Sequence, residues 1–196
     1  MSHHHHCFDP ANLARLDDPW RLNLFDVVDL LRNTGLSAGQ TVIDLGTGSG
    51  LYLPFLCGAV GPTGKVIGLD LEPKAIAYAE AKPAIAALSP LELVAIEPPP
   101  MPLPLADGSV DYVFLGFVFH ELDPLATVLL DLKRVLKPGG RLVLVEWTRN
   151  ERDKGPPADH VPSLPDSLAA LSEAGFISSQ VRDFPPYCTA ISTLRP

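Results

Sequence analysis

Short apolar runs alternate with helical stripes along most of the chain. Five runs rich in Val, Ile and Leu are typical of buried strands, and they are predicted at residues 41–46, 65–70, 91–96, 110–116 and 141–147. Between the last two runs, residues 125–136 carry an apolar stripe at helical spacing, with Lys133 and Arg134 near its end, where the helix dipole favours cations. Strands that alternate with helices at this spacing predict an α/β fold with a parallel, doubly wound sheet.

Capping and breaking residues set the expected helix ends. Asp123 followed by Pro124 predicts an N-cap with proline at the first helical position. Ser163 and Asp166 form a capping-box pattern before the last helix. The helix expected from residue 73 to about residue 88 contains Pro83, so we expect it to kink or stop there.

Four further segments have weaker patterns of apolar residues. Residues 20–33 have an apolar stripe that predicts an amphipathic helix, and residues 50–58 predict another helix after the first strand. The segments 176–182 and 187–194 are predicted as the last two strands.

Composition narrows the classes of function. The chain has 196 residues, of which 46% are hydrophobic and 19% charged, and this balance and length predict a single globular domain. A net charge of -8 disfavours a nucleic-acid surface and makes a small molecule the simpler partner. No apolar run approaches the ~20 residues of a membrane span.

The cysteines indicate the cellular compartment, and a run of histidines near the N-terminus has two interpretations. The three cysteines, at positions 7, 57 and 188, are odd in number and far apart, which predicts free thiols in a reducing, cytoplasmic setting. The run His3–His6 before Cys7 has two interpretations, a metal-binding tract or an affinity tag.

A glycine loop between the first strand and the first core helix is the principal candidate for chemistry. The run from Asp44 to Gly50 has glycine at positions 46, 48 and 50. Its third glycine comes one residue too early for the dinucleotide pattern G-x-G-x-x-G, in which the pyrophosphate lies on the helix N-terminus. A tight turn with no ligand is the alternative interpretation of the loop.

The loop resembles the first motif, D-x-G-x-G-x-G, of class I S-adenosylmethionine-dependent methyltransferases. Three further segments resemble parts of that family: residues 68–70 (Gly-Leu-Asp), 107–112 (Asp-Gly-Ser-Val-Asp-Tyr) and 136–142 (Leu-Lys-Pro-Gly-Gly-Arg-Leu). The resemblance covers about residues 40–176 and is closest to the small methyltransferases of ubiquinone and menaquinone biosynthesis and their unassigned relatives.

The resemblance implies a Rossmann-like, mostly parallel, seven-stranded sheet with an antiparallel last strand. It implies one methyltransferase domain over residues 1–196, with leader helices at 1–39 and a cofactor-binding core at 40–196. The implied contacts to S-adenosyl-L-methionine are Asp44, Gly46, Thr47, Gly48, Ser49, Gly50, Asp70, Leu71, Glu97, Pro98, Gly116 and Phe117. In this family the acidic residue after the second strand accepts hydrogen bonds from the ribose hydroxyls, a task that suits Asp70.

One position departs from the family pattern. Relatives often have Gly-Asp after the third strand, where the aspartate reaches the adenine amino group, whereas this chain has Ile96-Glu97-Pro98. Glu97 is the nearest match, and a solvated loop charge is the alternative interpretation.

By resemblance, the reaction is in-line displacement of a methyl group by a nucleophile of a small-molecule acceptor. A general base is needed only if the acceptor must lose a proton. His120 and Glu121 are the first candidates, with Tyr52, Tyr187 and Glu146 as weaker ones. A helix cap or a packing position is the alternative for His120-Glu121, whose spacing does not match a metal site.

Two loops rich in proline, residues 98–106 and 148–163, follow strands at the expected ligand edge. With the leader they form a hypothetical lid over the substrate, and rigid connection is the alternative. Trp20 and Phe25 of the leader either cover the substrate or pack on the sheet.

Three other functions remain open from the sequence. A cofactor-binding regulatory protein with little catalysis fits the lack of an obvious base. A nicotinamide oxidoreductase conflicts with the early third glycine. A nucleic-acid methyltransferase conflicts with the acidic charge, and residues 183–187 (Asp-Phe-Pro-Pro-Tyr) come too late in the chain for its catalytic motif.

Overall fold

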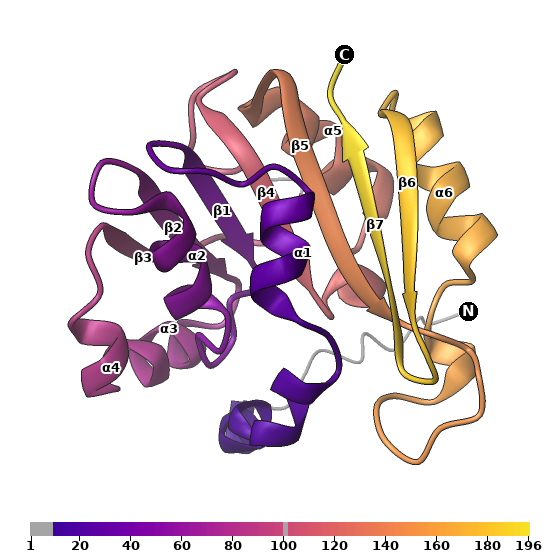
Figure 1. The fold of residues 1–196 in the computed structure, drawn as a ribbon, viewed down its shortest axis with the longest axis horizontal. Coiled ribbons are helices and arrows are strands. Elements are labelled where there is room, and N and C mark those ends of the chain that lie inside the picture. The colour runs from indigo at the N-terminus through magenta and orange to yellow at the C-terminus, as the bar shows by residue number, and fades with distance from the viewer. Residues whose placement is uncertain (1–9, 100–101) are drawn as a thin grey trace.

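A seven-stranded sheet with the order β3-β2-β1-β4-β5-β7-β6 forms the centre of the computed structural model, which describes residues 10–99 and 102–196 (Figure 1). Strands β1 to β5 are parallel, and β7 runs antiparallel to both of its neighbours. The strands are β1 (Thr41–Leu45), β2 (Lys65–Asp70), β3 (Leu91–Ala95), β4 (Val110–Gly116), β5 (Leu136–Trp147), β6 (Ile177–Phe184) and β7 (Cys188–Leu194). The predicted α/β class and mostly parallel sheet are confirmed.

Helices cover both faces of the sheet. They are the α-helices α1 (Val27–Asn33), α2 (Leu53–Val60), α3 (Pro73–Glu80), α4 (Pro83–Ala86), α5 (Leu125–Val135) and α6 (Leu164–Glu173), and the 3-10 helices η1 (Pro10–Asp17), η2 (Pro19–Asn23), η3 (Phe119–Glu121) and η4 (Ala158–His160). Buried side chains of α1 and α2 join one apolar core, and those of α5 and α6 join a second core on the opposite face. This doubly wound arrangement leaves the carboxyl ends of the strands open to a ligand.

Most of the predicted helix ends agree with the structure. Pro83 ends α3 and begins the short α4, as expected for a residue that cannot donate to the helix. The capping box at Ser163 and Asp166 is present. The N-cap predicted at Asp123 is wrong, because Pro124 has extended backbone angles and itself occupies the cap position before Leu125.

The leader differs from the single helix predicted over residues 20–33. It forms η1, η2 and the two-turn α1, and α1 begins only after Asp26, whose side chain accepts a hydrogen bond from the backbone N–H of Asp29. Asp18 similarly caps η2 through the N–H of Trp20. Two capping aspartates within nine residues divide the stripe, because each fixes a new helix start.

The start of β5 is also earlier than residue 141. Leu136 pairs with Val110, and a register shift follows before Arg141 pairs with Tyr112. Backbone bonds of 2.9 Å between Arg195 and residues 139 and 140 hold the intervening turn. The Pro-Gly-Gly turn therefore lies inside a bulged strand.

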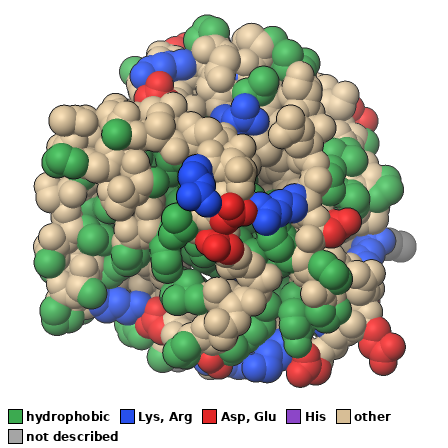
Figure 2. Space-filling view, in the orientation of Figure 1, with side chains coloured by type: hydrophobic (Ala, Val, Ile, Leu, Met, Phe, Trp, Pro, Cys, Tyr) green, Lys and Arg blue, Asp and Glu red, His purple; other side chains and the backbone are tan. Residues whose placement is uncertain are grey.

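On the face shown in Figure 2, basic and acidic side chains are interspersed and form no broad basic surface. In the described part of the chain, no helix is long and apolar enough to cross a membrane. Cys57 and Cys188 are buried free thiols, as predicted. Cys7 and the run His3–His6 lie outside the described residues.

Candidate active site

The glycine loop turns sharply at the carboxyl end of β1. Gly46 and Gly48 have φ angles of +73° and +53°, which favour glycine. A Cβ on Gly46 would lie 2.5 Å from Cγ2 of Val118, and one on Gly48 would lie 3.0 Å from Cδ1 of Leu16. The loop is therefore closely approached from two sides, by the segment after β4 and by the leader.

Two carboxylates flank this loop. The Asp70 Oδ2 atom accepts a 2.8 Å hydrogen bond from the Gly48 N–H, and its Oδ1 accepts one of 2.9 Å from the Glu72 N–H. Asp44 is buried and accepts a 2.8 Å bond from the Thr47 hydroxyl. Burial raises the pKa of Asp44 to about 7, and the Asp70 charge adds to that rise. Burial likewise raises the pKa of Asp70.

These residues fit a ligand that carries both positive charge and hydroxyl groups. The two acidic side chains favour a cation, and an ionised Asp70 can accept hydrogen bonds only. The buried hydroxyl of Ser49 faces Asp17 of the leader and, with Lys82 and Tyr78, lowers the pKa of that carboxyl against the effect of burial.

The predicted adenine side of the site is less formed. Leu71 is exposed, as are Glu97 and Pro98 at the end of β3. The Ile96 N–H donates to the Asp70 carbonyl at 2.9 Å, so Glu97 lies beside the end of β2. Its place at the ligand edge is therefore as expected, while no contact of its side chain supports a role.

Gly116 and Phe117, at the end of β4, lie on the side of the candidate site opposite the predicted adenine side. A Cβ on Gly116 would lie 2.8 Å from Cε2 of Tyr52, so only glycine allows this ring to pack there. Phe117 is buried at a φ of +60°, an unusual conformation for a bulky residue. Such strained backbone is frequently associated with functional sites.

A histidine–glutamate pair lies next to Phe117. The Nδ1 atom of His120 is 2.9 Å from Oε2 of Glu146, which also accepts a 2.9 Å bond from the His120 N–H. Burial lowers the pKa of His120, but the hydrogen bond and charge of Glu146, with the charge of Glu121, raise it above its ordinary value. Glu121 itself is 3.7 Å from Nε2 of the imidazole.

The other base candidates are placed differently. The hydroxyl of Tyr187 donates to Asp153 at 2.7 Å, on the loop after β5. Tyr52 packs edge-on against Phe114, and its buried hydroxyl lies beside the Arg21 guanidinium. Burial raises the pKa of Tyr52, which disfavours it as a base.

The leader is fastened to the glycine loop by contacts that the sequence did not indicate. The Nζ atom of Lys82 lies 2.6 Å from Asp17 Oδ1 and 2.6 Å from the Ser49 carbonyl oxygen. Tyr78 donates to the other oxygen of Asp17 at 2.8 Å. The local sequence gives one indication of these contacts: Pro83 ends helix α3, so Lys82 lies in a turn outside the helix.

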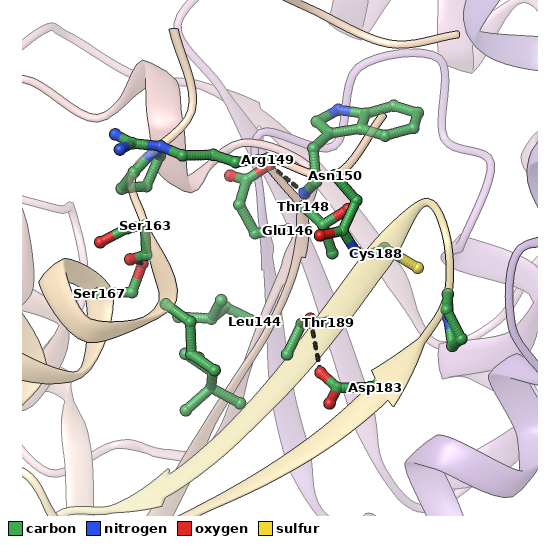
Figure 3. Close-up of a pocket in the computed structure, with 15 residues that line it drawn as sticks. Leu144, Glu146, Thr148, Arg149, Asn150, Ser163, Ser167, Asp183, Cys188 and Thr189 are labelled. Carbon is green, nitrogen blue, oxygen red and sulfur yellow. Dashed lines mark hydrogen bonds between the residues drawn. The ribbon is translucent and has the colours of Figure 1, made fainter. Parts of the chain in front are cut away.

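A hollow of about 410 Å³ lies between β5, β7 and the start of α6 (Figure 3). Its polar lining includes Glu146, Ser163, Ser167 and Asp183. Each of these four already has a protein hydrogen-bond partner. Because its polar groups are already hydrogen-bonded within the protein, the hollow is less suited to bind the acceptor than the edge of the sheet at the glycine loop.

Comparisons with known proteins agree with this geometry. The family model described as "Methyltransferase domain" matches residues 43–144. A demethylmenaquinone methyltransferase of Oceanobacillus iheyensis is 39% identical over 121 residues, which are 62% of this chain and 50% of that protein. One of Lactococcus lactis is 37% identical over 116 residues, 59% of this chain and 45% of that protein. The chain spans about half the length of these curated relatives.

A solved structure covers much more of the chain. The crystal structure of an S-adenosylmethionine-dependent methyltransferase from Aquifex aeolicus superposes with a TM-score of 0.92 and 39% identity, over 97% of this chain and 100% of that one. This similarity includes the leader region as well as the sheet.

Proposed function

This chain belongs to the class I S-adenosylmethionine-dependent methyltransferases, and we propose that it transfers a methyl group to a small-molecule acceptor. The observation that carries the proposal is the contact between Asp70 and the Gly48 N–H, which joins the glycine loop to the acidic residue after β2. The methyl donor in this family is S-adenosyl-L-methionine, so we place that ligand at the carboxyl ends of β1 and β2.

The cofactor would be held by residues with complementary chemistry. Asp70 offers acceptors for ribose hydroxyls, and the glycine loop lets the ligand lie close to the backbone. The buried carboxyl group of Asp44, with a pKa of about 7, can ionise beside a positively charged ligand. Leu71, Glu97 and Pro98 complete the proposed adenine side, and Gly116 and Phe117 the side that faces the acceptor.

When bound, the cofactor supplies a methyl group on a positively charged sulfur. An acceptor held in line with it forms the new bond with its own electron pair, while the pair of the carbon–sulfur bond stays on sulfur. Positioning of the acceptor and exclusion of water contribute most of the rate that such a site can provide.

His120 is the proposed base for an acceptor that must lose a proton. With Nδ1–H donated to Glu146, Nε2 carries the lone pair that accepts the proton. Glu146 is a positioning residue, since it fixes the tautomer and stabilises the imidazolium. Glu121, near Nε2, is proposed to assist by its charge.

The acceptor is proposed to be a small molecule of the quinone type. The names of the curated relatives support this class, as does the acidic charge of the chain, which disfavours nucleic acid. Residues 1–196 are proposed as one domain, with the leader before residue 40 as a lid. The contact of Leu16 with Gly48 supports the lid, because it places the leader on the glycine loop.

Calorimetric titration with S-adenosylhomocysteine tests the cofactor site. We expect micromolar binding to the parent chain and a loss of affinity of at least tenfold in Asp70→Asn, since hydrogen bonds to a charged group contribute about 1.5–3 kcal/mol. Asp159→Asn, at an exposed position on η4, is the matched control and should bind as the parent does. Absence of binding to the folded parent would contradict the proposal. Binding with no turnover on any acceptor would instead favour a regulatory module.

A further inference from the structure

One arginine organises the loop that follows β5 (orange in Figure 1). The guanidinium of Arg152 donates to three backbone carbonyl oxygens of its own loop, those of Thr148 at 3.0 Å, Lys154 at 2.5 Å and Pro156 at 2.5 Å. A guanidinium is planar and its donors point in set directions, so three such bonds fix the conformation of residues 148–156. We call the guanidinium and its three carbonyl partners the Arg152 clasp.

The Arg152 clasp lies on the indole ring of Trp147. The guanidinium carbon is 5.2 Å from the centre of that ring. Gly155 has a φ of +92°, and a Cβ there would lie 2.5 Å from Nη1 of Arg152 and 2.9 Å from Cε3 of Trp147. Glycine at position 155 therefore lets the loop close over both groups, in a backbone conformation that other residues rarely adopt.

This arrangement brings a positive charge to the proposed base. The Trp147 N–H donates to Oε1 of Glu146 at 2.7 Å, and Oε2 of the same carboxylate is 2.9 Å from Nδ1 of His120. Carbonyl oxygens satisfy the donors of Arg152 but do not neutralise its charge. In the part of the chain that the structure describes, no carboxylate lies within 4 Å of this guanidinium. Its charge therefore acts on Glu146 and His120.

The charged groups that act on His120 come from three elements. Burial and the charge of Arg152, in the loop, lower the pKa of the imidazole, whereas Glu146 on β5 and Glu121 on η3 raise it. Two carboxylates alone would favour the protonated ring, which has no lone pair left to accept a proton. A cation held nearby offsets part of their effect and favours the neutral ring.

We propose that Arg152 is a positioning residue for methyl transfer, because the Arg152 clasp holds a positive charge beside the His120–Glu146 pair and so keeps His120 free to accept a proton. The proton passes from the acceptor to Nε2, since Nδ1 donates to Glu146. This inference rests on the proposed function, in which His120 is the base. It gives the loop after β5 a task other than covering the substrate.

NMR titration of the ligand-free chain tests the inference on His120 itself. The chain has six histidines, so His120→Gln identifies the His120 signal by its absence. Arg152→Met removes the cation, and we expect the His120 pKa to rise above the parent value. Lys154→Met is the matched control, because it removes a cation from the same loop but keeps the carbonyl that the clasp uses, and it should leave the His120 pKa unchanged.

A second variant keeps the charge and displaces it. Gly155→Ala places a methyl group against Arg152 and Trp147, so the clasp should open although the guanidinium is still present. We expect the His120 pKa to rise in this variant as well. Cleavage by the glutamate-specific protease Glu-C after the exposed Glu151 reports the opening, and it should be at least about threefold faster in Arg152→Met and Gly155→Ala than in the parent.

Three results would overturn the inference. The first is a His120 pKa in Arg152→Met that equals the parent value or that changes equally in Lys154→Met. The second is faster cleavage of Gly155→Ala with no change in the His120 pKa, because the charge would then act without being held. The third is unchanged cleavage in both variants, because the clasp would then not fix the loop.

Calorimetry with S-adenosylhomocysteine separates this inference from the proposed function. If that ligand binds while His120 does not respond to Arg152→Met, the positioning role is wrong and the methyltransferase proposal stands. If His120 responds and the ligand does not bind, the arrangement of charges stands and the proposed function fails. With an acceptor that must lose a proton, the rising limb of the pH–rate profile should move to higher pH in Arg152→Met, since only the neutral ring accepts a proton.

Discussion

Glu146 near the end of β5 holds His120, on η3 after β4, by two contacts of 2.9 Å, one to the backbone N–H and one to Nδ1 of the ring. The other oxygen of Glu146 accepts a 2.7 Å bond from the Trp147 N–H. The carboxylate is thus fixed on both sides, and so is the imidazole. A group fixed in this way can remove a proton only from an acceptor bound on its Nε2 side.

Replacement of Glu146 should change the titration of His120. Glu146→Gln removes the charge that raises the histidine pKa, so we expect that pKa to fall. NMR of the imidazole carbons gives the pKa of His120 without any acceptor. Since only the neutral ring accepts a proton, the rising limb of a pH–rate profile should move to lower pH as well. An unchanged His120 pKa would contradict the assignment.

The same raised pKa has a consequence for stability. The protonated histidine stabilises the fold fully below its unfolded pKa of about 6.5, and this contribution is lost as pH rises through the folded value.

Asp44 should make stability depend on pH. Its pKa of about 7 in the fold lies above the unfolded value, so the fold binds a proton that stabilises it at low pH and is lost as pH rises toward 7. Asp44→Asn cannot ionise, so its free energy of unfolding relative to the parent should rise by up to about 4 kcal/mol between pH 4 and pH 8. Urea unfolding at pH 4.5 and pH 8 measures the change. For the exposed control Asp159→Asn, the difference from the parent should be the same at both pH values.

Gly46→Ala should be more destabilising than a positive φ alone explains. Gly139 has a similar φ of +76° with open space around its Cβ position, so Gly139→Ala measures the cost of a positive φ by itself, about 1–3 kcal/mol. The new methyl group at position 46 meets Val118, which adds about 1–3 kcal/mol. Thermal or urea unfolding gives both values. Val118→Ala combined with Gly46→Ala should recover part of the loss, and equal costs at positions 46 and 139 would contradict this account.

The contacts of Lys82 with the leader and the glycine loop should protect the leader from proteases. Lys82→Met removes the contacts to Asp17 and to the Ser49 carbonyl oxygen, so η1 should leave the glycine loop more often. We expect trypsin to cleave after Arg15, on η1, several times faster than in the parent. Lys74→Met, at an exposed position of the preceding helix α3, is the control. If S-adenosylhomocysteine binds under the leader, it should slow this cleavage in the parent, and identical rates in all three proteins would contradict the lid.

The strands and the glycine loop could be predicted because their signals are local. A run of β-branched residues, alternate glycines and an acidic strand end are each readable within a few residues, as at Asp44 and Asp70. The pair His120–Glu146 could not be predicted, because it depends on the pairing of Gly116 with Val145 between β4 and β5. The Asp17–Lys82 contact joins residues 65 positions apart and has no local signature. The leader helix was wrongly predicted because its apolar stripe continues across the two capping aspartates.

The position of β7 sets the order in which the sheet can be completed during synthesis on the ribosome. Strands β1 to β5 can pair as they emerge, but β5 meets its second neighbour only when residues 188–194 have been made. Strand β6 emerges earlier and pairs with β7 alone. Until then the nascent chain exposes the backbone edge of its longest strand, so chaperone contact during translation is expected to be concentrated on β5.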